Sequence, residues 1–298
     1  MVQHQLAVNA LDAEQLTATI GRIRRMRSRL QDENMRALIG SIEGLPVVPA
    51  VCRELDMLLA RPDYSMRDLA QVVEKDPALC AKLLQTVNSS FFSMGRKLTT
   101  VQDAVSYLGT NMVKNLVTSV SLWRSLEEAR PDTVSALSRV HRHCTRVATL
   151  ARKMMSGSRV KAEEAFVAGL LHDIGETLLI VYLPERFERA TNKARADGTP
   201  LYVAERALYA LDHAELGAHL LDAWGLPFPV LEAVAFHHAA PELDHRALET
   251  ADAVYLSELL VSAREVGTDP ALVLDDAYLE KLGATEQKQG ILRMLQDL

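Results

Sequence analysis

The chain has 298 residues, of which 48% are hydrophobic, enough for one large globular domain or two smaller ones. Its formal net charge of -6 argues against the broad basic surface of nucleic-acid-binding proteins, so no nucleic-acid partner is expected. The longest apolar run, 178–183, is too short to cross a membrane, and the first 30 residues lack an apolar secretion signal. We therefore expect a cytoplasmic protein without a transmembrane segment.

The first segment with a clear pattern is 15–40, where apolar residues recur at helical spacing among several arginines. The apolar stripe consists of Ile20, Ile23, Met26 and Leu30. Such a helix could touch an acidic partner or a membrane surface, but the interpretation we favour is a leading helix that packs on the body or on a second copy. Residues 1–39 are thus expected to form a helical lead-in, and a homodimer is compatible with it.

Residues 45–126 contain closely spaced helix start and stop signals. Pro46 and Pro49 open one helix, Asp76 directly before Pro77 is an N-cap followed by a first-turn proline, and Gly109 ends a helix. No alternating apolar pattern indicates a strand here or elsewhere, so the predicted class is all-α. Each of these residues has a structural role, and we expect no catalytic group in this half.

Three strings in this half resemble the HDOD family in order and spacing. They are LPVVPAV at 45–51, KDPALCAKLLQTVNSSFF at 75–92 and TVQDAVSYLGTNMVKNLV at 100–117. The resemblance implies a multi-helix fold in which an N-terminal helical half, 40–126, packs against an HD-like half, 132–265. Residues 40–265 would form the HDOD domain, and 266–298 a helical tail.

The strongest chemical signal is AGLLHDIG, which sets His172 beside Asp173 near the end of an apolar helix. A buried aspartate is costly unless it is paired or coordinated. A divalent metal would satisfy both side chains, because imidazole nitrogen and carboxylate oxygen are ligands for Mn, Fe and Zn. The structural alternative, in which Asp173 caps the following turn or pairs with a histidine, is equally compatible with the dipeptide.

Further histidines and acids occur on other predicted helices. His143 and His141 flank the buried stripe of one helix, and periodicity does not choose between them. A capping pair, Asp212 and Glu215, would place a histidine in the first turn of its helix. The candidate donors lie on five helices and are His143, His172, Asp173, His213, His237, His238 and Asp252. The three cysteines, by contrast, show no metal-binding or disulfide spacing and are expected to be buried thiols.

This set of donors resembles the HD superfamily of metal-dependent phosphohydrolases. The resemblance implies His143 as first ligand, with His141 as the fallback. His172 and Asp173 would be the HD pair. His213 with His237 or His238 would be the intermediate ligands, and Asp252 the last. One or two divalent transition metals, Fe, Mn or Zn, would be the cofactor.

The sequence also departs from the HD-GYP phosphodiesterases, which cleave cyclic di-GMP. Those enzymes follow HDIG with a lysine, whereas this chain has Glu176, and their GYP tripeptide is absent. A cyclic di-GMP phosphodiesterase is therefore disfavoured, because the phosphoryl oxygens would lack positive groups.

The preferred functional hypothesis is a bacterial signal-transduction protein that acts as a regulatory scaffold or output module without catalytic residues. As the HDOD resemblance implies, its partners would be other signalling proteins, among them cyclic di-GMP turnover proteins. The alternative is a metal-dependent HD-type phosphohydrolase or phosphodiesterase, in which the metals activate a water, or a metal or nucleotide sensor.

Overall fold

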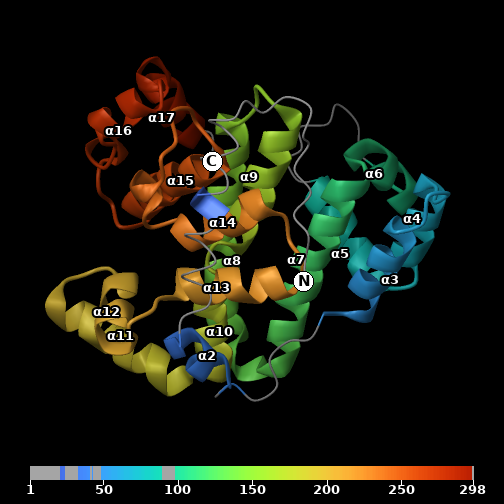
Figure 1. Cartoon of the computed structure of the whole chain (residues 1–298), viewed down its shortest axis with the longest axis horizontal. Coiled ribbons are helices and arrows are strands. Elements are labelled where there is room, and N and C mark those ends of the chain that lie inside the picture. Colours follow the sequence, from blue (N-terminus) through green and yellow to red (C-terminus); the bar gives the residue numbers. More distant parts are fainter. Residues whose placement is uncertain (1–20, 24–32, 41, 43–47, 89–97, 297–298) are drawn as a thin grey trace. The chain divides into compact units, whose positions relative to one another are not determined.

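The computed structural model describes residues 21–23, 33–40, 42, 48–88 and 98–296. Every regular element among these residues is an α-helix or a short 3-10 helix, which confirms the all-α class (Figure 1). The chain divides into two compact units, which are described separately. One comprises Leu45–Pro131, and the other combines Met1–Gly44 with Asp132–Leu298. We call them the 45–131 unit and the HD-like unit.

The 45–131 unit is a small bundle whose helices run from blue to green in Figure 1. They are α3 (Ala50–Leu59), α4 (Met66–Glu74), α5 (Pro77–Val87), α6 (Val101–Leu108) and α7 (Thr110–Ala129). Asp76 caps α5 by accepting hydrogen bonds from the amides of Ala78 and Leu79, as its place before Pro77 predicts. Gly109 ends α6 with a φ of 79°, a conformation that favours glycine.

The core of this unit is apolar, and leucines from several of its helices are fully buried. Examples are Leu55, Leu69, Leu83 and Leu116. The buried polar residues of this unit in the described segments are uncharged and lie on α7: Asn115, Thr118, Ser119 and Ser121. A small hydroxyl group on a helix can donate a hydrogen bond to a carbonyl of the preceding turn, as Ser119 does to the Asn115 carbonyl. The described part of this core therefore satisfies its polar groups and contains no buried charged side chain.

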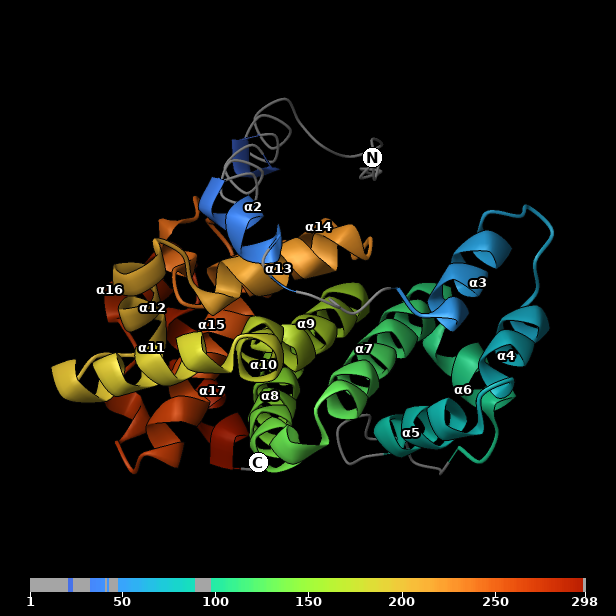
Figure 2. The same ribbon diagram turned by 90° about the horizontal axis from the view of Figure 1, so that it is seen from below.

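The HD-like unit is larger and holds the other α-helices of the described residues. They are α2 (Glu33–Gly40), α8 (Val134–Met154), α9 (Arg159–Leu171), α10 (Ile174–Tyr182), α11 (Pro184–Asp197), α12 (Leu201–Tyr209), α13 (His213–Ala223), α14 (Phe228–Phe236), α15 (Thr250–Glu265), α16 (Asp276–Lys281) and α17 (Lys288–Gln296). Helices α8 and α9 pack along each other, α15 lies against both, and α14 packs on α9 and α15 (Figure 2). Helix α10 packs against α13.

Two glycines allow helices of this unit to approach closely. A Cβ on Gly169 would lie 2.4 Å from the Ala148 Cα atom, where α9 crosses α8. A Cβ on Gly175 would lie 1.8 Å from the His213 carbonyl oxygen, where α10 meets α13. Because both distances are far below van der Waals contact, these crossings require glycine. The His172–Asp173 turn lies between them, so its position is set on both sides.

The stretch Arg159–Tyr182 is long and apolar enough, by composition, to cross a membrane. However, 89% of its most apolar window is buried inside the protein, as in the central helix of a folded core. A turn at His172 and Asp173 also divides it into α9 and α10. Its hydrophobicity is thus accounted for by the core of the HD-like unit.

The predicted N-terminal stripe stays a prediction, because Ile20, Met26 and Leu30 lie outside the described residues. From this lead-in, the Arg22 guanidinium lies 3.4 Å from the Glu232 carboxylate of α14. The three cysteines are free: Cys52 and Cys144 are buried, and Cys80 is half-buried.

Candidate metal centre

Donor side chains from five places in the HD-like unit converge beside one cavity. His143 comes from the middle of α8, His172 and Asp173 form the turn between α9 and α10, and His213 is the first residue of α13. His237 and His238 follow the last turn of α14, and Glu258 comes from α15. Six of the seven sequence-predicted donors are therefore brought together, and Glu258 joins them.

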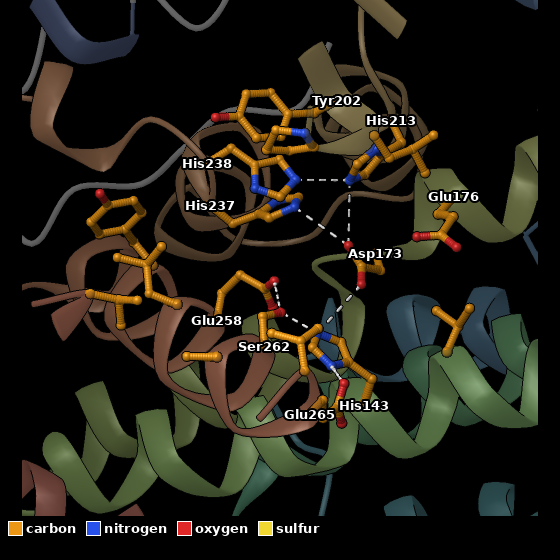
Figure 3. Close-up of a pocket in the computed structure, with 18 of the residues that line it drawn as sticks. His143, Asp173, Glu176, Tyr202, His213, His237, His238, Glu258, Ser262 and Glu265 are labelled. Atoms are coloured by element: carbon orange, nitrogen blue, oxygen red, sulfur yellow. Dashed lines mark hydrogen bonds and ion pairs between the residues drawn. The ribbon is translucent and has the colours of Figure 1, made fainter. Parts of the chain in front are cut away.

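The Asp173 carboxylate lies at the centre of this cluster, between two sets of histidines (Figure 3). Its Oδ1 atom is 3.5 Å from His213 Nε2 and 3.4 Å from His237 Nε2. Its Oδ2 atom is 3.1 Å from His172 Nε2 and 3.8 Å from His143 Nε2. Each oxygen of one carboxylate thus faces a different pair of imidazoles, which is the arrangement of a carboxylate that can bridge two cations.

Each side of the cluster also has a third donor. On one side, Glu258 Oε2 lies 2.7 Å from His143 Nε2 and 3.2 Å from His172 Nε2. On the other, His238 Nε2 lies 3.0 Å from His213 Nε2. Within each set of three the ligating atoms all lie within 4.8 Å of one another. These sets are His143, His172 and Glu258, and His213, His237 and His238.

Two of the histidines are oriented by carboxylates behind them. His213 Nδ1 lies 2.7 Å from Glu205 Oε2, and the same oxygen accepts the His213 backbone amide at 2.9 Å. His143 Nδ1 lies 3.0 Å from Glu265 Oε2. A carboxylate on the far nitrogen is the usual outer partner of a metal-bound histidine, since it fixes the ring and makes the near nitrogen a better ligand.

Two other histidines are oriented by backbone carbonyls. His172 Nδ1 donates to the Gly169 carbonyl, and His237 Nδ1 donates to the Val234 carbonyl, each at 2.8 Å. A carbonyl only accepts, so the Nδ1 atom carries the proton, and in the neutral ring Nε2 offers a lone pair to the cluster. Both Nε2 atoms are buried and lack a well-oriented hydrogen-bond partner among the described residues. A divalent cation would satisfy them, so the residues present fit a metal.

The electrostatics of the cluster keep its carboxylates charged. Burial alone would raise the pKa of Asp173, but the neighbouring histidines, His172 first, hold it well below its usual range. Burial is likewise outweighed at Glu258, where the hydrogen bond from His143 and the nearby His172 keep the pKa well below normal. The pKa of His143 is raised to about 9, because Glu258 outweighs the effect of burial. In the metal-free cluster these carboxylates are therefore paired with protonated histidines, and a bound cation would take the place of those protons.

Asp252, predicted as the last ligand, lies apart from this cluster. Its Oδ1 accepts the Tyr278 hydroxyl at 2.6 Å, and its Oδ2 lies 2.8 Å from His245 Nδ1. Oδ2 also accepts the backbone amide of Glu249 at 2.8 Å, so Asp252 serves as a helix-capping residue of α15. The acid of α15 in the cluster is Glu258, six residues later. His141, the fallback for His143, belongs to neither group of donors.

Glu176, the residue that departs from the HD-GYP pattern, is half-buried and lines the same cavity as Asp173. Burial, followed by the negative charge of Asp173, raises the pKa of its carboxyl group. Sequence reasoning also missed Glu205 and Glu265, which carry no motif of their own. Each is one acidic residue on a helix with no other distinguishing feature. Its histidine partner comes from another part of the chain, so the local sequence does not indicate the contact.

The unit is thus all-helical, with a His-Asp pair among converging histidines. The HDOD domain model matches residues 45–240, which is more than half of the sequence, so the chain belongs to the HDOD family. An uncharacterized protein of Treponema pallidum (strain Nichols) is 28% identical over 200 residues, which are 67% of this chain and 39% of that protein. The chain thus spans less than half the length of that relative.

Solved structures share the fold. A provisionally named phosphohydrolase from Shewanella amazonensis SB2B has a TM-score of 0.64 at 20% identity, over 90% of this chain and 95% of its own. A provisionally named signal transduction protein from Marinobacter aquaeolei VT8 has a TM-score of 0.52 at 22% identity, over 97% and 68%. At these identities the likeness establishes the fold and leaves the chemistry to be argued from the site.

Proposed function

We propose that this HDOD protein is a signalling protein whose HD-like unit binds a pair of divalent transition-metal ions and, through them, binds and hydrolyses a phosphoester. The observation that carries the proposal is Asp173, whose two oxygens each face a different pair of histidines at 3.1 to 3.8 Å. A helix cap or a simple ion pair would serve a structural purpose with fewer buried groups than a carboxylate that has imidazoles on both sides. The arrangement is therefore better explained by a role beyond stability.

The residues of one site would be His143, His172 and Glu258, and those of the other His213, His237 and His238, with Asp173 shared between them. Ions of this kind lower the pKa of a water molecule and polarise phosphoryl oxygens. The chain's own residues orient the donors, through Glu205 and Glu265, and Glu176 lies at the wall of the cavity.

The first test is metal content by inductively coupled plasma mass spectrometry on protein purified without chelators and then incubated with Mn, Fe or Zn. We expect about two ions per chain in the wild type and a loss of both in Asp173→Asn. The matched control is Asp252→Asn, since Asp252 is also buried and bonded to a histidine but lies outside the cluster. Equal metal content in Asp173→Asn and the wild type would refute the proposal.

Hydrolysis is tested on the loaded protein with bis(4-nitrophenyl) phosphate and 4-nitrophenyl phosphate, which report phosphodiesterase and phosphomonoesterase activity. Turnover that is lost in Asp173→Asn and retained in Asp252→Asn would support the reaction. Metal binding without turnover of either compound would leave a sensor, in which the ions and a bound ligand change the conformation without a reaction.

A second candidate is the role that the sequence favoured, a regulatory scaffold or output module that binds other signalling proteins. Glu176 is the observation that favours it, because a carboxylate stands where the HD-GYP enzymes carry a lysine, and a charged Glu176 would repel a phosphoryl group. Under this proposal Asp173→Asn leaves partner binding intact. Loss of a partner, such as a cyclic di-GMP turnover protein, after exchange of exposed residues on α3 and α4 would support it.

A further inference from the structure

The cavity beside the donors, of about 680 Å³, has two chemically different parts. Figure 3 shows the donor side, where His237 and His213 point toward Asp173, and His238 points toward His213. The rest of the lining is mainly apolar or aromatic and includes Tyr202, Tyr255, Leu259, Val266 and Val273. This inference rests on the proposed function, since it concerns what a metal-loaded cavity would hold.

The aromatic part is continuous with the metal donors. The Tyr202 ring stacks on the His238 ring, with centroids 4.2 Å apart and an interplanar angle of 16°. Tyr255 is half-buried in the lining and meets the Tyr278 ring edge to face at 5.5 Å. A ligand reaching from the donors into this part therefore meets ring and aliphatic surfaces, which favour a flat, uncharged group.

The charge of the cavity limits the ligand further. Two divalent ions would bring four positive charges, and the carboxylates of Asp173 and Glu258 bring two negative ones. The remaining charge of about +2 is what one phosphoryl group offsets. Beyond the donors, the lining has one arginine, Arg139, against the carboxyl groups of Glu176 and Glu265. A second or third phosphate would enter a region without surplus positive charge.

We propose that the ligand of this cavity is an organic phosphoester with a single phosphoryl group and a flat, uncharged remainder. The phosphoryl group lies at the donors, and the remainder lies against Tyr255, Leu259 and Val266. Free phosphate lacks the apolar contacts, and di- and triphosphates bring negative charge to the acidic wall. The ligand class is thus narrower than the phosphoesters in general.

Isothermal titration calorimetry on the manganese-loaded full chain tests this, with adenosine 5′-monophosphate, the corresponding diphosphate and triphosphate, and inorganic phosphate as probes. We expect the monophosphate to bind about tenfold or more tightly than each of the other three. Tyr255→Ala should weaken the monophosphate by about 5- to 100-fold, the range for loss of one stacking contact, and leave phosphate unchanged. Tyr255 is not a donor, so metal content should stay at the wild-type value.

A second pair of variants tests the charge argument without touching the core. Val266, which lines the cavity, and Leu272, which does not, are 78% and 79% exposed. Val266→Lys should raise the affinity for the diphosphate relative to the monophosphate, and Leu272→Lys should not. Equal or tighter binding of the triphosphate by the wild type, or no effect of Tyr255→Ala, would overturn the inference. Failure of the proposed function would look different, because either no metal would bind or the loaded protein would show no turnover of the nitrophenyl phosphates.

Discussion

The two units of the chain differ in which polar side chains they bury. In the 45–131 unit the acids lie at helix caps and on the surface, as Asp76 does, and the buried polar groups are hydroxyls and one amide. In the HD-like unit, histidines and carboxylates are buried together, Asp173 and His237 among them. Burying a charged group costs several kcal/mol unless a partner compensates for it. Among the described residues, it is therefore the HD-like unit that contains an arrangement that stability alone would not favour.

This contrast separates residues that fold the protein from residues that do something else. The 45–131 unit has capped helices and a core rich in leucine. The HD-like unit has the same caps and a larger core, yet it also assembles buried titratable groups around one cavity. Substitutions should therefore change stability alone in the first unit, and both stability and metal binding in the second.

The largest expected effect is on folding of the 45–131 unit. Leu83→Ala removes a fully buried side chain of α5 and should lower the free energy of unfolding by about 2–5 kcal/mol. Denaturant unfolding monitored by circular dichroism measures it. Metal content per folded chain should stay at the wild-type value, and its loss would mean that the two units do not divide their roles as described.

Gly175→Ala should lower both the stability of the HD-like unit and its affinity for metal. The new methyl group would meet the His213 carbonyl, so α10 must move away from α13, and Asp173 with it. We expect a loss near the upper end of the 1–3 kcal/mol that overpacking costs, together with weaker metal binding. Gly290→Ala, on α17 with open space around it, is the control; it should raise the stability slightly, because alanine favours a helix more than glycine does, and leave metal binding unchanged. A stable Gly175→Ala protein with full metal content would contradict the close approach.

Glu205→Gln tests the support behind a donor. Glu205 holds His213 through both its ring and its backbone amide, and loss of such an outer partner weakens metal binding by about 10- to 100-fold. Competition with a fluorescent chelator measures the affinity. Glu163→Gln, which removes a surface ion pair with Arg159, serves as control and should leave affinity unchanged. Equal affinities in the two variants would remove Glu205 from the site.

The smallest expected effect is at a helix cap. Ser65→Ala removes the capping box of α4 and should cost about 1 kcal/mol of unfolding free energy, with no change in metal binding. Ser158→Ala at the start of α9 should cost less, because the hydrogen bond that Ser158 Oγ accepts from the Lys161 amide is longer, at 3.5 Å. Thermal unfolding of both variants compares them. A larger loss for Ser158→Ala would show that α9 depends on its first turn more than its packing indicates.

Much of this division could be predicted from local sequence. Helical periodicity gave the all-α class, and the N-cap at Asp76 and the stop at Gly109 are local effects that need no tertiary information. The HD pair was visible because a histidine and an aspartate in an apolar helix conflict with their surroundings. Which lone acid of α15 reaches the cluster was not predictable, since Asp252 and Glu258 both interrupt apolar residues and only the packing of α15 on α8 and α9 distinguishes them.

The outer partners were beyond sequence reasoning for a related reason. Glu265 lies more than a hundred residues from His143, and nothing near it in the sequence indicates that contact. Gly175 is the last residue of the AGLLHDIG string, but its role depends on the close approach of the His213 carbonyl of another helix. Local chemistry thus identified the donors, and tertiary packing determines how they are oriented.

The central claim is that Asp173 lies between two metal ions. The most direct measurement is anomalous X-ray diffraction at the manganese edge from crystals of the manganese-loaded protein. We predict two anomalous peaks on opposite sides of the Asp173 carboxylate, one beside His143, His172 and Glu258, and the other beside His213, His237 and His238. Crystals that show no peak at this carboxylate, at manganese concentrations well above those that bind to HD-type sites, would contradict the account.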